Sequence, residues 1–344
     1  MVQGPFRYAG PFFFVLSIPL FYYAVGPVAP LLTVALLLLL LMGVEWLAPG
    51  ARVENSRGAE MAFRLVPFVY VPVQLGVIVW SVTQAGDAGG LSVAALALAV
   101  GVTTGVFGVL AAHELVHSQE PVSQFFGVAM LSGMSYRHFR VAHVFGHHRA
   151  AATEQDPASA RLGENVYRFL VRSIAGQLLD AWRIEGLRLS KTGKSLLRHR
   201  LLGDACVMAS IYLAIFLLIG ANGVFLFAAE SFVGIVVLEA FNYVAHYGLK
   251  RDSGTSGHEP FGAAHSWNSS NGLANAFIFN MGHHSRHHAR PMAQYQTLEH
   301  DDEACELPLG YAASMLLAMI PPLWHQVMDP AVQRLHTQSS NLSV

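Results

Sequence analysis

Long apolar stretches dominate the pattern of this 344-residue chain and predict helices that cross a membrane. A helix needs about 20 apolar residues to span the hydrocarbon core of a bilayer. Six stretches meet or nearly meet this length: 8–26, 28–48, 62–83, 91–116, 203–220 and 222–245. Two further apolar stretches, 122–136 and 309–324, predict shorter interfacial or buried helices. We therefore expect an all-α integral membrane protein with six transmembrane helices, forming a single membrane domain over residues 1–344.

The positions of the basic residues predict the orientation of these spans, because Lys and Arg are enriched in cytoplasmic loops. Arg7 precedes the first span. Three arginines, Arg52, Arg57 and Arg64, lie between the second and third spans. The segment 137–200 contains twelve Lys and Arg residues but five acidic ones. All of these segments fall on one side of the membrane if the N- and C-termini are both cytoplasmic.

This topology predicts a multi-pass protein of the cell inner (plasma) membrane with a cytoplasmic cap formed by residues 117–202 and 246–330. The first apolar run has no clear small-residue cleavage site, so we expect a retained anchor rather than a cleaved signal peptide. The polar tail, residues 331–344, is expected to be disordered.

Composition agrees with a membrane protein and excludes other classes. Hydrophobic residues make up 53% of the chain and charged residues 12%, whereas soluble domains carry about 25% charged residues. The formal net charge of −1 gives no reason to expect a nucleic-acid partner. Cys206 and Cys305 are far apart, so they suit neither a disulfide framework nor a CxxC metal site.

Histidine is unusually abundant, with 17 copies, and clusters of it follow the predicted fourth span. His113 and His117 are four residues apart, as are His143 and His147. Residues at i and i+4 lie on one face of an α-helix, so each pair predicts two imidazoles that reach one ion. His148, which follows directly, is expected to point to a different face.

Further histidines lie at the end of the sixth predicted span and beyond it. His246 ends that span, and His284, His287 and His288 have the spacing i, i+3 and i+4. Buried polar groups near a bilayer cost free energy unless they are paired or ligated. Clusters that all fall on one membrane face therefore predict a metal site.

The number of histidines indicates two metal ions, because a zinc site takes about four ligands. A zinc protease with Glu114 as its base would leave the later clusters unexplained. Neutral imidazoles suit iron, copper, nickel or zinc, so ligand type alone leaves the metal open. An iron pair that reduces dioxygen would explain a site beside an apolar substrate reservoir.

Five motifs resemble those of the membrane alkane hydroxylases (alkane 1-monooxygenases), within the fatty acid desaturase and hydroxylase superfamily. They are HELVHS, HVFGHHRAAATEQDPASAR, NYVAHYGL, HSWNS and GHHSRHH with the following YQTLEHDDEACELPLGY. The resemblance implies a non-haem di-iron monooxygenase with two Fe ions. It would use O2 to hydroxylate a C–H bond, at the terminal methyl of an apolar substrate such as an n-alkane. Its electrons would come from a rubredoxin-type donor, which an NAD(P)H-dependent reductase recharges.

The resemblance also implies the metal ligands, and no catalytic residue beyond them is assigned. Matched motif by motif, the ligands are His113, His117, His143, His147, His148, His246, His284, His287 and His288. By the same matching His283 is not a ligand. No iron role falls on His138, His258, His265 and His300, although His265 could contact a ligand from behind.

Two positions depart from the family pattern. Family members commonly carry glutamate where this chain has Ala142 and Ala245. Groups that accept a ligand histidine's second N–H orient it and tune the metal. Asp156, Glu114 or backbone carbonyls could replace the missing carboxylates. Alternatively, the chain is a divergent member with another substrate or outcome.

Two polar residues in the sixth span are candidates to line a cavity below the metals. Glu239 precedes His246 by seven residues and Asn242 precedes it by four, which predicts a shared helix face. An acid within a membrane is a functional candidate. Glu230, nearer the opposite end of the span, is expected to be interfacial.

Other functions remain open from the sequence. A desaturase or another enzyme acting on fatty acyl chains would share the histidine clusters. A xylene-monooxygenase-like enzyme would attack the methyl group of an alkyl-arene, and Ala142 and Ala245 leave that reading open. A metal transporter is disfavoured, because the first three spans contain almost no polar residues.

Overall fold

The computed structural model describes residues 4–47, 60–254 and 257–342, and almost all of its regular structure is helical. The predicted all-α class is confirmed. The strands are two residues long and form two small ladders, β1 (Ser253–Gly254) with β2 (Gly257–His258) and β3 (Trp267–Asn268) with β4 (Cys305–Glu306). Arg52 and Arg57, on which part of the topology prediction depends, lie outside the described residues.

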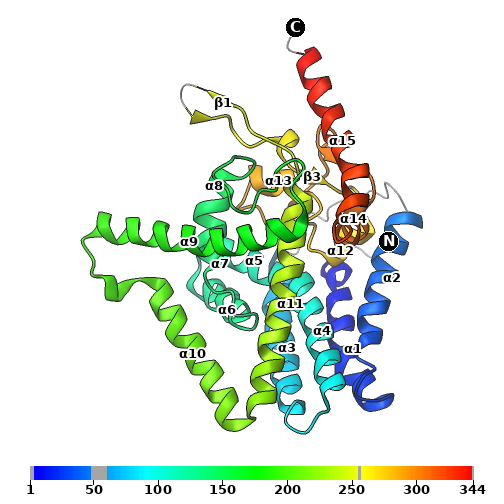
Figure 1. Cartoon of the computed structure of the whole chain (residues 1–344), viewed down its shortest axis with the longest axis vertical. Helices are drawn as coiled ribbons and strands as arrows, with labels where there is room; N and C mark the ends of the chain where they lie inside the picture. Colours follow the sequence, from blue (N-terminus) through cyan, green and yellow to red (C-terminus); the bar gives the residue numbers. More distant parts are fainter. Residues whose placement is uncertain (1–3, 48–59, 255–256, 343–344) are drawn as a thin grey trace.

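Each of the six long apolar stretches forms a helix of one bundle (Figure 1). They are α1 (Gly10–Ala24), α2 (Leu31–Leu47), α3 (Glu60–Gln84), α4 (Gly90–Thr103) continued by the π-helix η2 (Thr104–Gly108) and α5 (Val109–His117), α10 (Arg200–Leu218) and α11 (Ala221–His246). Among the described residues, four helices are long and apolar enough to cross a membrane: Met61–Gln84, Gly90–His117, Arg200–Leu218 and Ala221–His246. With 15 residues, α1 is shorter than a full span, and so is the described part of α2, with 17 residues.

The remaining elements cover the end of the bundle where α5 and α11 finish (Figure 1). They are η1 (Pro5–Tyr8), α6 (Pro121–Ser132), α7 (Phe139–Val141), the π-helix η3 (Ala142–His147), α8 (His148–Ala150), α9 (Val166–Thr192), η4 (Leu196–Arg198), η5 (Ala263–His265), α12 (Gly272–Phe277), α13 (His284–Ala289), η6 (Tyr295–Thr297), α14 (Gly310–Ala318) and α15 (Pro321–Leu342). The short apolar stretches 122–136 and 309–324 correspond to α6 and to α14 with the start of α15, as expected. The tail is different from the prediction, because α15 continues as a helix through Leu342.

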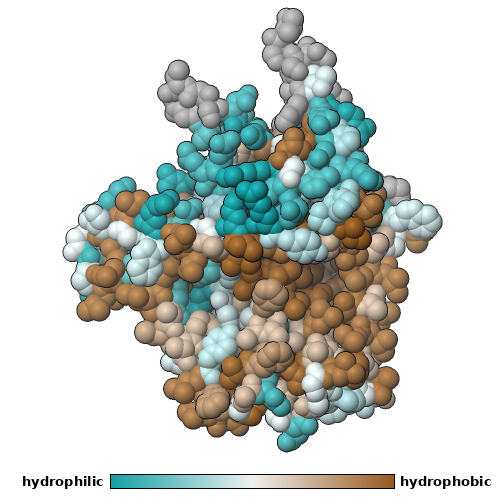
Figure 2. Space-filling view, viewed as in Figure 1, coloured by the Kyte–Doolittle hydropathy of each residue, from teal (hydrophilic) through white to brown (hydrophobic). Residues whose placement is uncertain are grey.

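The surface separates into an apolar lower part and a polar upper part (Figure 2). The apolar part covers the bundle, and the polar part covers the segments around α13 and α15. Contiguous apolar surface of this extent is typical of contact with a membrane. The chain is therefore a membrane protein.

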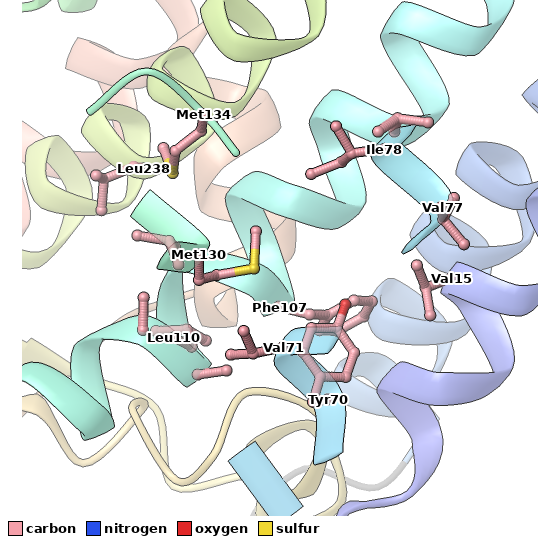
Figure 3. Packing of buried hydrophobic residues seen from close by; sticks show 14 of the residues in the cluster. Val15, Tyr70, Val71, Val77, Ile78, Phe107, Leu110, Met130, Met134 and Leu238 are labelled. Atoms are coloured by element: carbon pink, nitrogen blue, oxygen red, sulfur yellow. The ribbon is translucent and has the colours of Figure 1, made fainter. Parts of the chain in front are cut away.

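The bundle core is mainly apolar, and a buried polar cluster joins two of its helices. Tyr70 and Phe107 pack beside Val71 at its centre (Figure 3). The Tyr70 hydroxyl donates a hydrogen bond to Gln74 Oε1 at 2.7 Å, and Gln74 Nε2 donates to Thr104 Oγ1 at 2.9 Å. Because these buried groups satisfy one another, they join α3 to the start of η2 at little cost.

The cap is attached to the bundle by hydrogen bonds with α2 and with the short helix η1 that precedes α1. Both carboxylate oxygens of Glu45, on α2, accept from the backbone N–H groups of Ala312 and Ala313 in the first turn of α14. These N–H groups have no partner within their own helix, so the carboxylate caps α14. Asn280 Nδ2 donates to the Tyr8 hydroxyl at 2.9 Å. The segments beside α13 are thereby fixed to η1 and α2.

Glycines allow α11 to approach the continuous helix of α4 and η2. A Cβ on Gly105 would lie 2.6 Å from the Gly234 carbonyl oxygen and 2.7 Å from Val237 Cβ. A Cβ on Gly101 would lie 2.6 Å from the Glu230 carbonyl oxygen. Small residues at such contacts let membrane helices pack closely. This contact holds the two helices that end in the histidines.

We predict that Gly105→Ala destabilises the protein by about 1–3 kcal/mol, because the added methyl must push α11 away. The matched control is Gly76→Ala in α3, where a Cβ would meet no atom within 4 Å. That change is expected to be neutral or slightly stabilising, because alanine is the better helix former. Thermal unfolding of the purified variants in detergent measures both effects. Equal melting temperatures for the two variants would contradict the close-packing argument.

Candidate metal centre

Nine histidines from four segments lie together where α5 and α11 end. The end of α5 carries two of these histidines, and the end of α11 carries one. The segment formed by η3 and α8 carries three, and α13 carries the other three. These are the nine positions that the resemblance predicts as ligands: His113, His117, His143, His147, His148, His246, His284, His287 and His288. His283 belongs to neither of the groups that they form, and its ring lies 6.2 Å from that of His300.

The nine imidazoles form two groups. Within each group, one nitrogen from every residue lies within 4.8 Å of the others. The first group contains His113, His117, His143, His148 and His287. The second group contains His147, His246, His284 and His288. Apart from the half-buried His148, all of these residues are buried.

The shortest separations within the groups match the spacing of ligands around a metal ion. In the first group, His148 Nε2 lies 3.0 Å from the Nε2 atoms of His143 and His287. In the second group, the two closest Nε2 pairs are 3.1 and 3.2 Å apart. Two nitrogens bound at right angles, each about 2.1 Å from a metal, would lie roughly 3.0 Å from one another.

Unpartnered nitrogens support the same conclusion. The Nε2 atoms of His117 and His147 are buried and have no hydrogen-bond partner among the described residues. A buried polar atom without a partner costs free energy and calls for an explanation. A metal ion accepts the lone pair of a neutral imidazole, so the donor set fits a metal centre.

Charge in the site favours metal binding as well. Burial, and then the neighbouring histidines, lower the pKa values of His143, His148 and His287 well below their usual range. These imidazoles are therefore neutral at pH 7. Because a histidine must be neutral to bind a metal, the folded protein presents its ligands in the binding state.

The π-helix η3 decides which histidines share a group. The spacing in the sequence predicts that His143 and His147 reach one ion. In a π-helix the backbone hydrogen bonds run from i to i+5, so His143 and His148 lie on one face. His147 turns instead into the second group. The predicted pairing of His143 with His147 is wrong, because this segment is not α-helical.

The other two clusters follow α-helical spacing. In α5, His113 and His117 belong to the first group together. In α13, His284 and His288 share the second group, while His287 lies in the first. For these two clusters, the sequence correctly predicted that the i, i+4 pair shares a helix face. It did not predict the group to which His287 belongs.

Asp156 contacts His147 from behind. Its Oδ2 lies 2.8 Å from His147 Nδ1 and accepts a hydrogen bond from the Ser159 hydroxyl at 2.6 Å. Burial opposes ionisation of this carboxyl, but His147 and these hydrogen bonds outweigh it and lower the pKa of Asp156. The carboxylate therefore fixes the orientation of the imidazole, so that Nε2 faces the second group.

A backbone carbonyl has the equivalent place behind His246. His246 Nδ1 lies 3.4 Å from the carbonyl oxygen of His265, whose own ring contacts Glu259. Ala142 and Ala245, the two positions that depart from the pattern of the resemblance, are both buried. Asp156 and the His265 carbonyl thus contact two of the histidines. These contacts agree with the explanation that other groups replace the missing carboxylates.

Asn268 positions α13, a role that the sequence did not reveal. Its Oδ1 accepts hydrogen bonds from the backbone N–H and from the hydroxyl of Ser285, both at 3.0 Å. Trp267, on the same strand β3, accepts a hydrogen bond from the Tyr311 hydroxyl through its carbonyl. The HSWNS motif therefore braces the histidine helix. In the sequence, only the presence of Asn268 and Ser285 within these two motifs pointed to this contact.

Three other residues that the sequence singled out near the metal site, Glu114, Glu239 and Asn242, have partners other than the histidines. Glu114 is half-buried, and one of its carboxylate oxygens accepts a hydrogen bond from the Tyr295 backbone N–H at 3.4 Å. Glu239 accepts hydrogen bonds from four side chains, including Asn242 at 3.4 Å. The others are the Tyr136 hydroxyl, the Ser173 hydroxyl and Gln177 Nε2.

Glu239 and Asn242 do not line the apolar cavity below the histidines, so that expectation is wrong. The face of α11 that carries Glu239 packs against α9, whereas Leu238 and Phe241 face the cavity. Glu230 is fully buried within the protein. The helical period placed Glu239 relative to His246, but it could not show which neighbour covers each face.

We predict that Asp156→Asn weakens metal binding by about 10- to 100-fold, because His147 loses the carboxylate that orients it. The matched control is Asp180→Asn, which changes an acid on α9 that pairs with Arg183. Metal per chain, measured by elemental analysis after dialysis against a chelator, compares the two. Equal metal retention would contradict the role of Asp156.

Comparisons with known proteins agree with this geometry. Residues 90–304 match the model of the fatty acid desaturase family. The chain is 33% identical over 342 residues to alkane 1-monooxygenase 1 of Pseudomonas aeruginosa, which covers 96% of this chain and 87% of that protein. It is 39% identical over 240 residues to alkane 1-monooxygenase of Acinetobacter baylyi, which covers 69% of this chain and 59% of that protein.

A more distant relative has a different name. The xylene/toluene monooxygenase hydroxylase component XylM of Pseudomonas putida is 27% identical over 246 residues, 68% of this chain and 63% of that protein. The identity is higher with the alkane 1-monooxygenases, and one of them aligns along nearly the whole chain. With its membrane helices and its buried histidine groups, the chain belongs to the alkane 1-monooxygenase family of oxidoreductases, within the wider fatty acid desaturase family.

Proposed function

We propose that the protein is a membrane di-iron monooxygenase that uses O2 to hydroxylate a C–H bond of an apolar substrate, the terminal methyl of an n-alkane. The observation that carries this proposal is an apolar cavity that ends beside the two histidine groups. The family supplies the reaction class, because relatives are named alkane 1-monooxygenases.

The cavity has a volume of about 330 Å³ and lies between α2, α4, α11 and α14. Leu110, at its upper end, precedes His113 by one helical turn. Phe241, also in its wall, has its ring centroid 5.4 Å from that of His284. Val34 and Leu98 line its other end, toward the opposite side of the bundle.

Such a cavity would present the end of a chain to the metals. Its walls are almost entirely aliphatic and aromatic, so they bind an alkyl chain through burial alone. They also exclude water from the reacting carbon. A chain that enters along the helices reaches the histidines with its terminal methyl first, which supports terminal hydroxylation.

Two iron ions are the cofactors that this proposal assigns, one to each histidine group. The first ion would be held by the first group and the second ion by the second group. When bound, the irons supply the reduction of O2 and the oxidation of the C–H bond. The protein's own share is to hold the imidazoles, orient them through Asp156 and the His265 carbonyl, and position the substrate.

The electron donor and the topology also belong to the proposal. A rubredoxin-type protein, recharged by an NAD(P)H-dependent reductase, would deliver electrons to the face that carries the histidines. The excess of Lys and Arg in residues 137–200 suits an acidic partner. The same excess supports a cytoplasmic location for this face, with six spans and both termini on that side of the inner membrane.

An alkyl-arene methyl group is the second candidate substrate. The similarity to the xylene/toluene monooxygenase component favours it. Ala142 and Ala245 also replace glutamates that are common in the family, although Asp156 and a carbonyl contact the ligands nearby. A fatty acyl chain, oxidised or desaturated, is the remaining alternative.

Turnover of a substrate panel tests the proposed function. Membranes containing the protein, supplied with rubredoxin, reductase and NADH, are offered n-alkanes, fatty acyl chains and alkyl-arenes. We expect 1-alkanols from the alkanes. Benzylic alcohols as the main product would favour the second candidate, and alkenes would indicate a desaturase.

We predict that His147→Ala abolishes turnover and lowers the iron content, because the second group then keeps three of its four imidazoles. The matched control is His283→Ala, which removes a buried imidazole beside the site that belongs to neither group. It is expected to retain iron and activity. Iron analysis and alkanol formation are measured on the same preparations. Full iron retention in His147→Ala, or tightly bound zinc without iron in the unchanged protein, would overturn the proposal.

We also predict that Val102→Phe shifts the preferred alkane to a shorter chain, because Val102 lines the cavity. Leu91→Phe is the control, since Leu91 lies on the same helix, exposed and outside the cavity. Product yields across a series of alkane lengths show the shift. An unchanged length profile for Val102→Phe would place the substrate elsewhere.

A further inference from the structure

A large groove separates α10 from the rest of the bundle. It has a volume of about 900 Å³ and is lined by α3, α6, α10 and the start of α11. Figure 1 shows α10 leaving the end of α9 and running apart from the bundle until it reaches α11. Its walls are mainly aliphatic, with Ile78, Val128, Ile211 and Ile215 among them. The groove belongs to neither histidine group, and the proposed reaction does not use it.

One end of the groove carries two arginines that share a carboxylate. Arg137 Nε donates to Asp204 Oδ1 at 2.8 Å, and Arg140 contacts the same carboxylate at 3.3 Å. Arg137 also donates to the Ser132 hydroxyl at 2.6 Å. Two guanidinium groups and one carboxylate leave an excess positive charge here.

Arg140 is the less satisfied of the two arginines. Its Nε is buried and has no hydrogen-bond partner among the described residues. Arg200 lies near enough to act on the charge of Arg140, and Glu185 is shared between Arg188 and Arg200. The cluster therefore has more guanidinium groups than carboxylates. A half-buried, partly unpaired guanidinium is a ready donor for an anion, and its fork matches the oxygens of a phosphate.

The charged end of the groove lies at the level where the surface changes from apolar to polar. Asp204 is in the first turns of α10, directly after η4 and α9. In Figures 1 and 2, α9 crosses the molecule near that boundary. α9 exposes both apolar and cationic residues, including Leu179, Trp182 and Arg183, as helices that lie in a membrane interface do. The arginines are therefore at the depth of lipid headgroups.

We propose that this groove binds one anionic phospholipid, with its phosphate on Arg140 and Arg137 and an acyl chain between α10 and α3. The charge at the arginine end matches a single phosphate. The apolar walls run from that end toward Leu218 and Ile219, as an acyl chain of the same leaflet would. α10 then gains a packing partner on the side where protein does not fill the space.

The test uses the full-length, metal-loaded protein in detergent, titrated with phosphatidylglycerol and followed by native mass spectrometry. Phosphatidylcholine with the same acyl chains, inorganic phosphate and hexadecane are the comparison probes. We expect phosphatidylglycerol to bind most tightly at one site per chain. Equal binding of phosphatidylcholine, or hexadecane in its place without bound lipid, would overturn the proposal.

Two pairs of variants separate this site from lipid that coats the protein non-specifically. Arg140→Gln should weaken phosphatidylglycerol binding about fivefold, whereas Arg183→Gln, at an exposed arginine of α9, should not. Ala214→Phe fills the groove and should remove the bound lipid. Ala209→Phe, at an exposed alanine of α10 outside the groove, should leave it in place.

Iron content and alkane turnover in detergent verify that each variant is folded. Wild-type lipid affinity in folded Arg140→Gln and Ala214→Phe proteins would overturn the proposal. A change of oligomeric state in Ala214→Phe without loss of lipid would also overturn it, because the groove would then be an interface between copies of the chain.

Discussion

The gathering of nine imidazoles, all but one of them buried, at the end of an apolar bundle is the constraint on which the rest of this structure depends. Unpaired polar groups are costly away from water, and here the nitrogens converge on one another, with the carboxylate of Asp156 behind His147. A ligand shared by the imidazoles of each group removes this cost. The helices must therefore hold four separate segments in fixed positions, which explains the close contact of α11 with Gly101 and Gly105.

The same constraint explains why the two sides of α11 differ. Toward α2 and α14 the helix presents Leu238 and Phe241, and this side stays open as an apolar cavity. Toward α9 it presents Glu239, whose carboxylate is enclosed by hydrogen-bond donors. One side is the proposed binding site for a substrate without polar groups, and on the other side hydrogen bonds anchor the helix that carries His246.

Much of the fold could be predicted from hydrophobicity alone. The six long apolar stretches became helices close to the expected bounds, because a run such as LLTVALLLLLLMG has few alternatives. The nine histidines were found from their spacing and from the family motifs. The reduced length of α1 and α2, and the helical tail of α15, were not predicted, since hydropathy does not report where a helix ends.

The grouping of the histidines was beyond the reach of the sequence. The sequence spacing of His143, His147 and His148 is compatible with an α-helix and with a π-helix. Only the backbone conformation shows which of the two helices forms. The partners of Glu239 come from α9 and from Tyr136, more than 60 residues away along the chain. Contacts of this kind depend on packing, which local periodicity does not encode.

The register of η3 has a consequence for how far apart two bound ions could ever lie. His147 and His148 are consecutive yet belong to different groups, and so are His287 and His288. Consecutive Cα atoms are separated by a fixed distance of about 3.8 Å. Two covalent links thus tie the groups together, one at the junction of η3 with α8 and one within α13. Each link limits the gap between the groups to this Cα spacing plus the reach of two imidazole side chains, however the rest of the bundle bends.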